Sequence, residues 1–292
     1  GSEMCIRDRK NAGMIKSDTV WTWWMDRNYP DFTYYNGEYY LNAGMSYQDL
    51  AEKLQNPDIS HKKVKVTIPE GYTVFDIAST LEKKNVCSAK DFLKACSTTE
   101  GYDYDWLADF PKNDPHVGYV LEGFLFPATY DFGENSKATD IADVMLEAFD
   151  QRITDEVKTY CKQRGYTLYQ FVTLCSIVQK EALSKSSQGN IASTLENRLD
   201  KGMKIECDVT YYYAKALRDH GFSQSVYDAY YTYRCPGLPA GPIANPGTEI
   251  MTATVEHPST DYLYFFSDLK GNFHFAATYG EFESLKAKYP WK

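Results

Sequence analysis

One carboxylate of this sequence is predicted to lie on an apolar helix face. Residues 168–185 carry apolar side chains at helical spacing on nearly every side, which predicts a buried helix. Glu181 follows Leu174 by seven residues and Ile177 by four, so it projects from the same side as both. Burial disfavours the charged form of a carboxyl group and raises its pKa toward that of a usable general acid. Glu181 is therefore a candidate for proton transfer.

A surface ion pair is the competing interpretation of Glu181. Lys185 follows it at i, i+4 in the favourable order, which is typical of a solvated pair where a buried helix reaches the surface. Gln179, two residues before Glu181, projects in another direction. Spacing alone favours the ion pair over the acid.

A second group of acidic residues precedes an aromatic stretch. Glu206 and Asp208 flank Cys207 directly before residues 209–213. Two neighbouring carboxylates can act as acid and base, yet alternate acidic residues before a helix or strand more often cap it.

Residues 234–248 contain seven Gly or Pro among fifteen, which predicts a fixed, non-regular loop. A loop of this kind is either a structural connection or a binding loop, and its length inside a domain favours binding. Asn245 followed by Pro246 predicts the start of a helix with Asn245 as its cap.

The composition limits the classes of function. The chain has 292 residues with 31 Lys and Arg against 40 Asp and Glu, and its formal charge of −9 argues against binding to nucleic acid. Its 25 Tyr, 15 Phe and 5 Trp suit a core and also suit contact with an uncharged or sugar-like polymer. The seven cysteines have no metal-binding spacing, so we expect no metal, no cofactor and no disulfide framework.

The N-terminal segment shows neither a membrane span nor a signal peptide. No apolar run approaches the roughly 20 residues that a membrane helix needs, and no basic start leads into an apolar stretch. The chain opens on Gly-Ser-Glu-Met-Cys-Ile-Arg-Asp-Arg, which has no periodicity. We expect residues 1–32 to be a non-native, disordered or linker segment.

Residues 44–54 and 71–81 form an internal repeat. Each copy has the pattern of a capping box that starts a helix, Ser46 with Asp49 and Thr73 with Asp76. Extended segments at 39–41 and 64–68 precede the two copies, and this strand–turn–helix pattern resembles LysM-type peptidoglycan-binding units, although a spacer role is equally compatible. We expect a LysM-like subdomain over residues 33–112.

A larger mixed α+β domain is expected over residues 113–292, which makes the fold class α+β. Apolar residues recur at helical spacing through 141–157, which predicts one long helix that Gly165 ends. Helices are also predicted over 190–201 and 280–288, and a hairpin joins strands 262–266 and 273–276.

Six motifs occur in an order that resembles the YceG-like family of endolytic murein transglycosylases. They are LEGFLFPATY (121–130), SIVQKEA (176–182), ENRLDKGM (196–203), YYTY (230–233), GLPAGPIANPG (237–247) and TDYLYF (260–265). The resemblance covers about residues 37–278, and the ordered set is far more specific than any one motif.

The resemblance implies cleavage of the β-1,4 bond between N-acetylmuramic acid (MurNAc) and N-acetylglucosamine (GlcNAc) in nascent glycan strands, with a 1,6-anhydro product end. One acidic residue suffices, and the family's catalytic Glu falls on Glu181, which reverses the preference for the ion pair. The substrate cleft is expected to be lined by Glu122, Asn197, Glu206, Asp208, Thr232, Tyr233 and Asn245.

The resemblance also implies a location and partners. It places the protein at the extracytoplasmic face of the bacterial cytoplasmic membrane, with glycan strands as substrate and peptidoglycan synthases as partners. The family has a membrane anchor, which is missing from this chain, so the chain looks truncated.

Three departures from the family pattern leave two alternatives open. Gln179 replaces the first acid of the I-x-E-K-E motif, Ala128 replaces an Asp, and Val209 a Pro. One alternative is a non-catalytic peptidoglycan-binding or scaffold relative. The other is a muramidase-type hydrolase, which needs a second carboxylate, Asp208 or Glu122, about 5–10 Å from Glu181.

Overall fold

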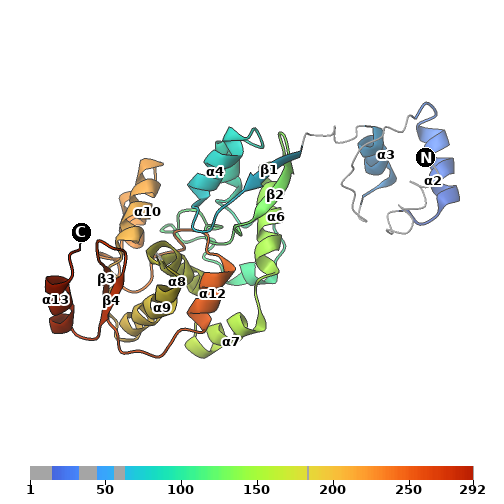
Figure 1. Cartoon of the computed structure of the whole chain (residues 1–292). Helices are drawn as coiled ribbons and strands as arrows, with labels where there is room; N and C mark the ends of the chain where they lie inside the picture. The colour runs from blue at the N-terminus through green and yellow to red at the C-terminus, as the bar shows by residue number, and fades with distance from the viewer. Residues whose placement is uncertain (1–14, 33–44, 56–62, 183, 292) are drawn as a thin grey trace. The chain divides into compact units, whose positions relative to one another are not determined.

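The computed structural model describes residues 15–32, 45–55, 63–182 and 184–291 of the chain. It divides into two compact units, one of residues 1–64 and 133–135 and the other of residues 65–132 and 136–292. The elements are labelled along the chain in Figure 1. In the described part of the chain, each helix is too short or too polar to cross a membrane.

The N-terminal unit packs two short helices around aromatic side chains. Helix α2 (Asp18–Asn28) buries Trp21, whose ring meets the Tyr47 ring edge-on at 5.1 Å. Helix α3 (Tyr47–Gln55) begins with the predicted capping box, because the Asp49 amide donates to Ser46 Oγ at 3.1 Å and the Ser46 amide donates back to the carboxylate at 3.2 Å. Residues 18–28, expected to be non-native or linker, therefore form a helix. The predicted strand at 39–41 lies outside the described residues.

The second unit mixes helices with two small two-stranded sheets, β1–β2 and β3–β4, and is α+β as expected. From β1 onward the elements are β1 (Lys63–Thr67), α4 (Val74–Lys83), α5 (Ala89–Ala95), a 3₁₀ helix η1 (Asp105–Asp109), β2 (Thr129–Gly133), α6 (Ala138–Asp150), α7 (Asp155–Arg164), α8 (Leu168–Glu181), α9 (Lys185–Asp200), α10 (Asp208–Asp219), α11 (Gln224–Tyr230), α12 (Thr248–Val255), β3 (Tyr264–Ser267), β4 (Phe273–Ala276) and α13 (Tyr279–Lys288).

Helix α4 begins with the second predicted capping box, formed by Thr73 and Asp76. The two copies of the sequence repeat fall in different compact units. A LysM-like subdomain over residues 33–112 stays a prediction.

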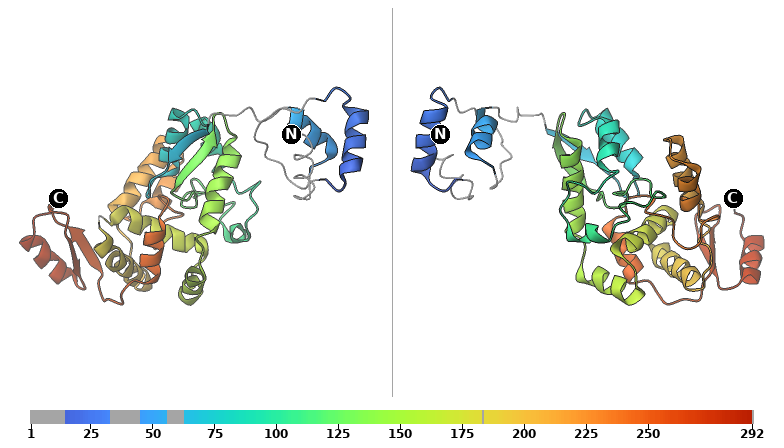
Figure 2. Two further views of the ribbon diagram at one scale, coloured as in Figure 1. Left: turned by 45° about the vertical axis from the view of Figure 1, so that its right-hand side comes forward. Right: turned by 180° about the vertical axis from the view of Figure 1, so that it is seen from behind.

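Helix α8 lies in the middle of the second unit and packs against α9, α10 and α12 (Figures 1 and 2). Every residue from Phe171 to Val178 is buried, which confirms the predicted buried helix. The helix ends at Glu181, four residues before the predicted end, because Ala182 has an extended backbone (φ −74°, ψ 112°). This early end places Glu181 at the last position of a rigid, buried element.

Two other predicted boundaries were wrong. The periodic stretch 141–157 is two helices, because α6 ends at Asp150 and Thr154 caps a new helix, α7. Gly165 ends α7 in the left-handed conformation, as predicted. Asn245 does not cap α12, since Gly247 is the N-cap. The C-terminal hairpin was predicted correctly, with antiparallel pairing of β3 and β4.

Candidate active site

Glu181 stands where the C-terminus of α8 meets the N-terminus of α10. Its side chain is partly buried, and burial raises the pKa of the carboxyl to about 7. The negative charge of Asp208 acts in the same direction. The Cys207 thiol and the Val209 backbone amide oppose both effects, because donors beside a carboxyl favour its ionised form. The raised pKa expected from the apolar helix face is present.

The competing ion pair between Glu181 and Lys185 was wrong. Lys185 opens the next helix, α9, and its ammonium lies 3.1 Å from the carboxylate of Glu249. The i, i+4 spacing does not bring the two side chains together, because Glu181 ends one helix and Lys185 begins another. The Glu181 carboxyl is therefore left to interact with the α10 terminus.

Two buried threonines hold the N-terminus of α10 in place. Thr210 Oγ1 lies 2.8 Å from Thr232 Oγ1, and the Thr232 amide donates to Thr210 Oγ1 at 3.2 Å. Thr232 Oγ1 also accepts from the Cys207 amide at 3.1 Å. These bonds fix the first turn of α10 to the turn after α11, so the donors that face Glu181 have a defined position.

The last turn of α8 is tied to segments far away in the sequence. Gln179 Oε1 accepts from the Gly247 amide at 3.0 Å, and the Lys180 ammonium donates to the Gly71 carbonyl at 3.2 Å. Gly71 and Asn245 are themselves joined, since the Gly71 amide donates to the Asn245 carbonyl at 2.8 Å. Gln179 thus has a structural role as a hydrogen-bond acceptor. A carboxylate in the same place could accept the same hydrogen bond.

Two of the predicted cleft residues are exposed near Glu181. Tyr233, with 40 % of its surface accessible, donates its hydroxyl to Asp208 Oδ1 at 2.9 Å. Asp208 is exposed and close enough to Glu181 to raise its pKa. Both side chains are therefore available to a substrate at the candidate acid.

Three other predicted cleft residues are fully buried, which corrects their role. Glu122, Thr232 and Asn245 are each 0 % exposed. Glu122 accepts from the Val74 amide at 2.8 Å and from Asn245 Nδ2 at 2.7 Å. It therefore anchors the start of α4 to the loop at residues 234–248, here called the glycine-rich loop. These side chains are satisfied by hydrogen bonds within the protein, and they connect the segments that surround the site.

The remaining two predicted residues hold neighbouring segments. Asn197 Nδ2 donates to the carbonyls of Thr260 and Tyr262, at 2.9 and 3.0 Å. Glu206 accepts from the guanidinium of Arg198 at 2.5 Å. Asn197 therefore fixes the approach to β3, and Glu206 is an exposed end of an ion pair.

Sequence reasoning missed two contributors, the Cys207 thiol and the Val209 amide. The available signal was the helical periodicity of residues 208–219, which would have placed Cys207 at an N-cap and its neighbours in the first turn. The aromatic stretch at 209–213 alone is compatible with either a helix or a strand, and the longer periodicity is needed to choose the helix.

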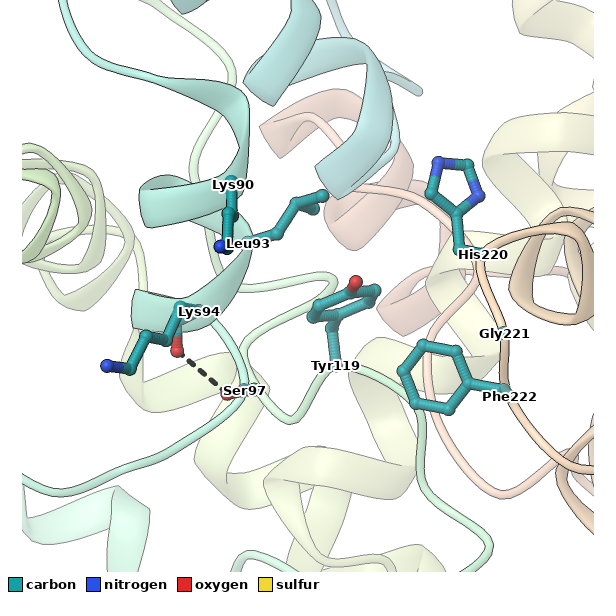
Figure 3. A pocket seen from close by; sticks show the side chains of 8 residues that line it. All are labelled: Lys90, Leu93, Lys94, Ser97, Tyr119, His220, Gly221 and Phe222. Atoms are coloured by element: carbon teal, nitrogen blue, oxygen red, sulfur yellow. Dashed lines mark hydrogen bonds between the residues drawn. The ribbon is translucent and has the colours of Figure 1, made fainter.

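A separate cavity of about 550 Å³ lies beside α5 and the end of α10 (Figure 3). Tyr119 points into the middle of this view, while the Lys94 ammonium points away from it. None of the predicted site residues is among the lining residues, which are Lys90, Leu93, Lys94, Ser97, Tyr119, His220, Gly221 and Phe222.

Comparisons with known proteins agree with the sequence motifs. A model of the YceG-like family matches residues 3–288. The chain is 28 % identical over 293 residues to the endolytic murein transglycosylase of Streptococcus pneumoniae serotype 2 (strain D39 / NCTC 7466), covering 91 % of this chain and 52 % of that protein. It is 31 % identical over 265 residues to the endolytic murein transglycosylase of Bacillus subtilis (strain 168), covering 87 % and 72 %.

A solved structure is also similar. The crystal structure of a yceG-like protein from Listeria monocytogenes matches with a TM-score of 0.65 and 28 % identity, over 97 % of this chain and 94 % of that one. The chain spans about half the length of the Streptococcus relative, as the 52 % coverage states.

Proposed function

The chain belongs to the YceG-like family, and on that premise we propose that it is a peptidoglycan lytic transglycosylase with Glu181 as its single acid and base. The observation that carries the proposal is the position of Glu181, at the last residue of a buried helix and beside the N-terminus of α10, where burial raises its pKa to about 7. A carboxyl with a pKa near the operating pH can both release and recover a proton efficiently. The names of the curated relatives support the same reaction class.

In the proposed reaction, protonated Glu181 donates its proton to the oxygen that links MurNAc to GlcNAc. The bond between that oxygen and the muramoyl C1 breaks. The Glu181 carboxylate that remains is stabilised by the partial positive charge at the N-terminus of α10. It then removes the proton of the sugar's own 6-hydroxyl, whose oxygen bonds to C1. The ring closure consumes no water and returns Glu181 to its acid form.

The proposal places this activity on nascent strands at the extracytoplasmic face of the cytoplasmic membrane, where each cut ends the elongation of one strand by its synthase. Its direct test is digestion of uncross-linked glycan strands followed by mass spectrometry. Product ends lighter by one water than a reducing end are expected. Ordinary reducing ends would overturn the ring-closing mechanism.

The position of Asp208 supports a second candidate function, a hydrolase that uses water. It is the exposed carboxylate whose charge acts on Glu181, whereas Glu122 is buried and bonded to Val74 and Asn245. A second carboxylate could activate water in place of the sugar hydroxyl. The product ends from the same digestion distinguish the two reactions.

The activity of this chain is expected to fall above pH 7. The reaction begins with protonated Glu181, so kcat/KM is expected to be level below the pKa of about 7 and to fall about tenfold per pH unit above it. Initial rates on soluble glycan strands between pH 5.5 and 9 would measure this limb. Thermal unfolding over the same range is the control for loss of structure, and a level profile up to pH 9 contradicts the assignment.

Cys207 is expected to affect the pH above which kcat/KM falls. Cys207→Ala removes a donor that lowers the pKa of Glu181, so the fall in kcat/KM should move to higher pH. Cys207→Ser keeps a donor at the same place and is the matched control, with a limb at or below that of the parent. Identical pH profiles for all three proteins would show that the thiol does not act on the acid.

A further inference from the structure

A row of tyrosines extends over the surface from the candidate active site. The ring centroids follow one another at 5.4 Å from Tyr233 to Tyr231, 5.4 Å from Tyr231 to Tyr211, and 5.5 Å from Tyr211 to Tyr212. Tyr233 is 40 % exposed and Tyr212 is 66 % exposed. The two tyrosines between them are half-buried. The row therefore presents two exposed rings to solvent, joined by two half-buried rings between them.

The row is joined to the catalytic junction by a hydrogen bond. The Tyr233 hydroxyl donates to Asp208 at 2.9 Å, and Asp208 is the first residue of α10. Tyr211 and Tyr212 lie in the first two turns of the same helix, and Tyr231 and Tyr233 lie directly after α11. A strand bound at Glu181 can therefore leave the site along rings that the start of α10 and the segment after α11 supply together.

Exposed aromatic side chains of this kind indicate binding. A contiguous apolar patch rimmed by polar groups on a protein surface marks an interaction site. Tyrosine supplies a large flat contact at low cost in conformational entropy, and its hydroxyl can bond to polar partners. Pyranose rings combine an apolar face with peripheral hydroxyls, so they match both parts of the side chain. Each step along the row is comparable with the size of one sugar ring.

Two arginines border the row. Both lie near Tyr227, a buried ring whose centroid is 5.8 Å from that of Tyr231 and 6.5 Å from that of Tyr211. Arg218 lies 4.6 Å from the Tyr227 ring, and Arg234 lies 5.6 Å from the rings of Tyr227 and Tyr231. Arg234 is paired with Asp228 at 2.6 Å. Arg218 has no ion-pair partner among the described residues and is exposed. In a chain of charge −9, an exposed cation beside an aromatic surface favours an anionic group on the ligand.

We propose that this tyrosine row is a distal subsite for the glycan strand, with sugar rings against Tyr233, Tyr231, Tyr211 and Tyr212 and a carboxylate of the stem peptides against Arg218. The subsite rests on the proposed function, because the strand that it holds is the substrate of Glu181. It explains how a long strand is retained while its neighbouring segment is cut. It also makes binding stronger for long, peptide-bearing strands than for short or stripped ones.

The test of the tyrosines is binding by the full chain carrying Glu181→Gln, so that no turnover occurs. In that protein, Tyr212→Ala is expected to weaken the affinity for long uncross-linked strands by about threefold to tenfold. The affinity for a single disaccharide unit is expected to change less, so the ratio of the two affinities falls. The matched control is Tyr279→Ala in α13, which removes an equally exposed tyrosine (61 %) away from the row.

Arg218→Gln tests whether the positive charge of Arg218 binds a carboxylate of the stem peptides. It is expected to weaken binding of strands that carry stem peptides, most at low salt, and to leave strands stripped of peptides bound as before. An unchanged long-to-short ratio in Tyr212→Ala, or equal losses in Tyr212→Ala and Tyr279→Ala, overturns the subsite. Retained cleavage by the Glu181→Gln chain would instead overturn the proposed function, and an assay for cleavage products run beside the binding titration distinguishes that outcome from failure of the subsite.

Discussion

Glu181→Gln is expected to lower the rate of glycan cleavage by about a hundredfold to ten-thousandfold. The amide is nearly isosteric with the carboxyl but cannot give a proton to the leaving oxygen or remove one from the sugar hydroxyl. Both steps of the proposed reaction depend on this side chain. The loss should therefore appear in kcat, and substrate binding should be retained.

The control for Glu181→Gln is Glu256→Gln, which removes an exposed carboxylate at the end of α12 and should leave the rate unchanged. The Glu181→Gln protein is expected to unfold with a free energy within about 1 kcal/mol of the parent, since it loses no ion pair. Initial rates from strand digestion and a denaturant titration measure the two quantities. More than a tenth of the parent rate in a folded Glu181→Gln protein would remove Glu181 from the mechanism.

Glu122→Ala is expected to lower the free energy of unfolding by about 3–5 kcal/mol. Glu122 is fully buried, and its loss leaves the Val74 amide and one N–H of the Asn245 side chain without an acceptor, beside an empty volume. The other N–H of Asn245 still donates to the Tyr72 carbonyl at 2.9 Å. Natural domains have only about 5–15 kcal/mol in total, so the change is a large fraction of stability. Equilibrium unfolding in urea measures it.

Glu122→Gln is the matched control, because it keeps the size of the side chain and one acceptor, and it is expected to cost less than the alanine. It also tests the pKa of Glu122, which burial raises from 4.5 to about 7. The folded protein binds this proton more tightly than the unfolded chain. The contribution of this proton to the free energy of unfolding is therefore fully present below pH 4.5 and is lost as the pH rises through 7. The parent should lose about 3 kcal/mol of stability over that pH window from this group. In Glu122→Gln, the free energy of unfolding should no longer contain this dependence on pH.

A Glu122→Ala protein as stable as the parent within 1 kcal/mol would show that Val74 and Asn245 find other acceptors. An unchanged pH slope in Glu122→Gln would show that the proton affinity of Glu122 is the same in the folded and unfolded chains.

The position of Glu181, the proposed acid, could be predicted from the sequence. The apolar helix and the position of Glu181 on it are local properties, and the family motif chose between the acid and the ion pair. Capping boxes and the C-terminal hairpin were equally local, so the boxes were predicted at the residues where they occur and the first hairpin strand within two residues of its position. These features depend on short spacings that the sequence shows directly.

The surroundings of the acid could not be predicted in the same way. The periodicity of apolar residues does not reveal that α8 ends at Glu181, because the next helix, α9, also carries apolar residues that face the core. Motif membership also does not separate side chains that touch a ligand from those that hold the site. Glu122 and Asn245 belong to motifs because they join α4 to the glycine-rich loop, and burial shows this only in three dimensions.

The ties at the last turn of α8 have a consequence for the order in which the protein becomes active. Gly71 precedes the helix by about a hundred residues, and Gly247 follows it by more than sixty. Contacts between segments so distant in sequence form late, after long loops have closed. A chain still emerging from synthesis therefore has Glu181 but lacks the loop that fixes its helix end. Cleavage of glycan should begin only when residues up to at least Gly247 have folded onto α8.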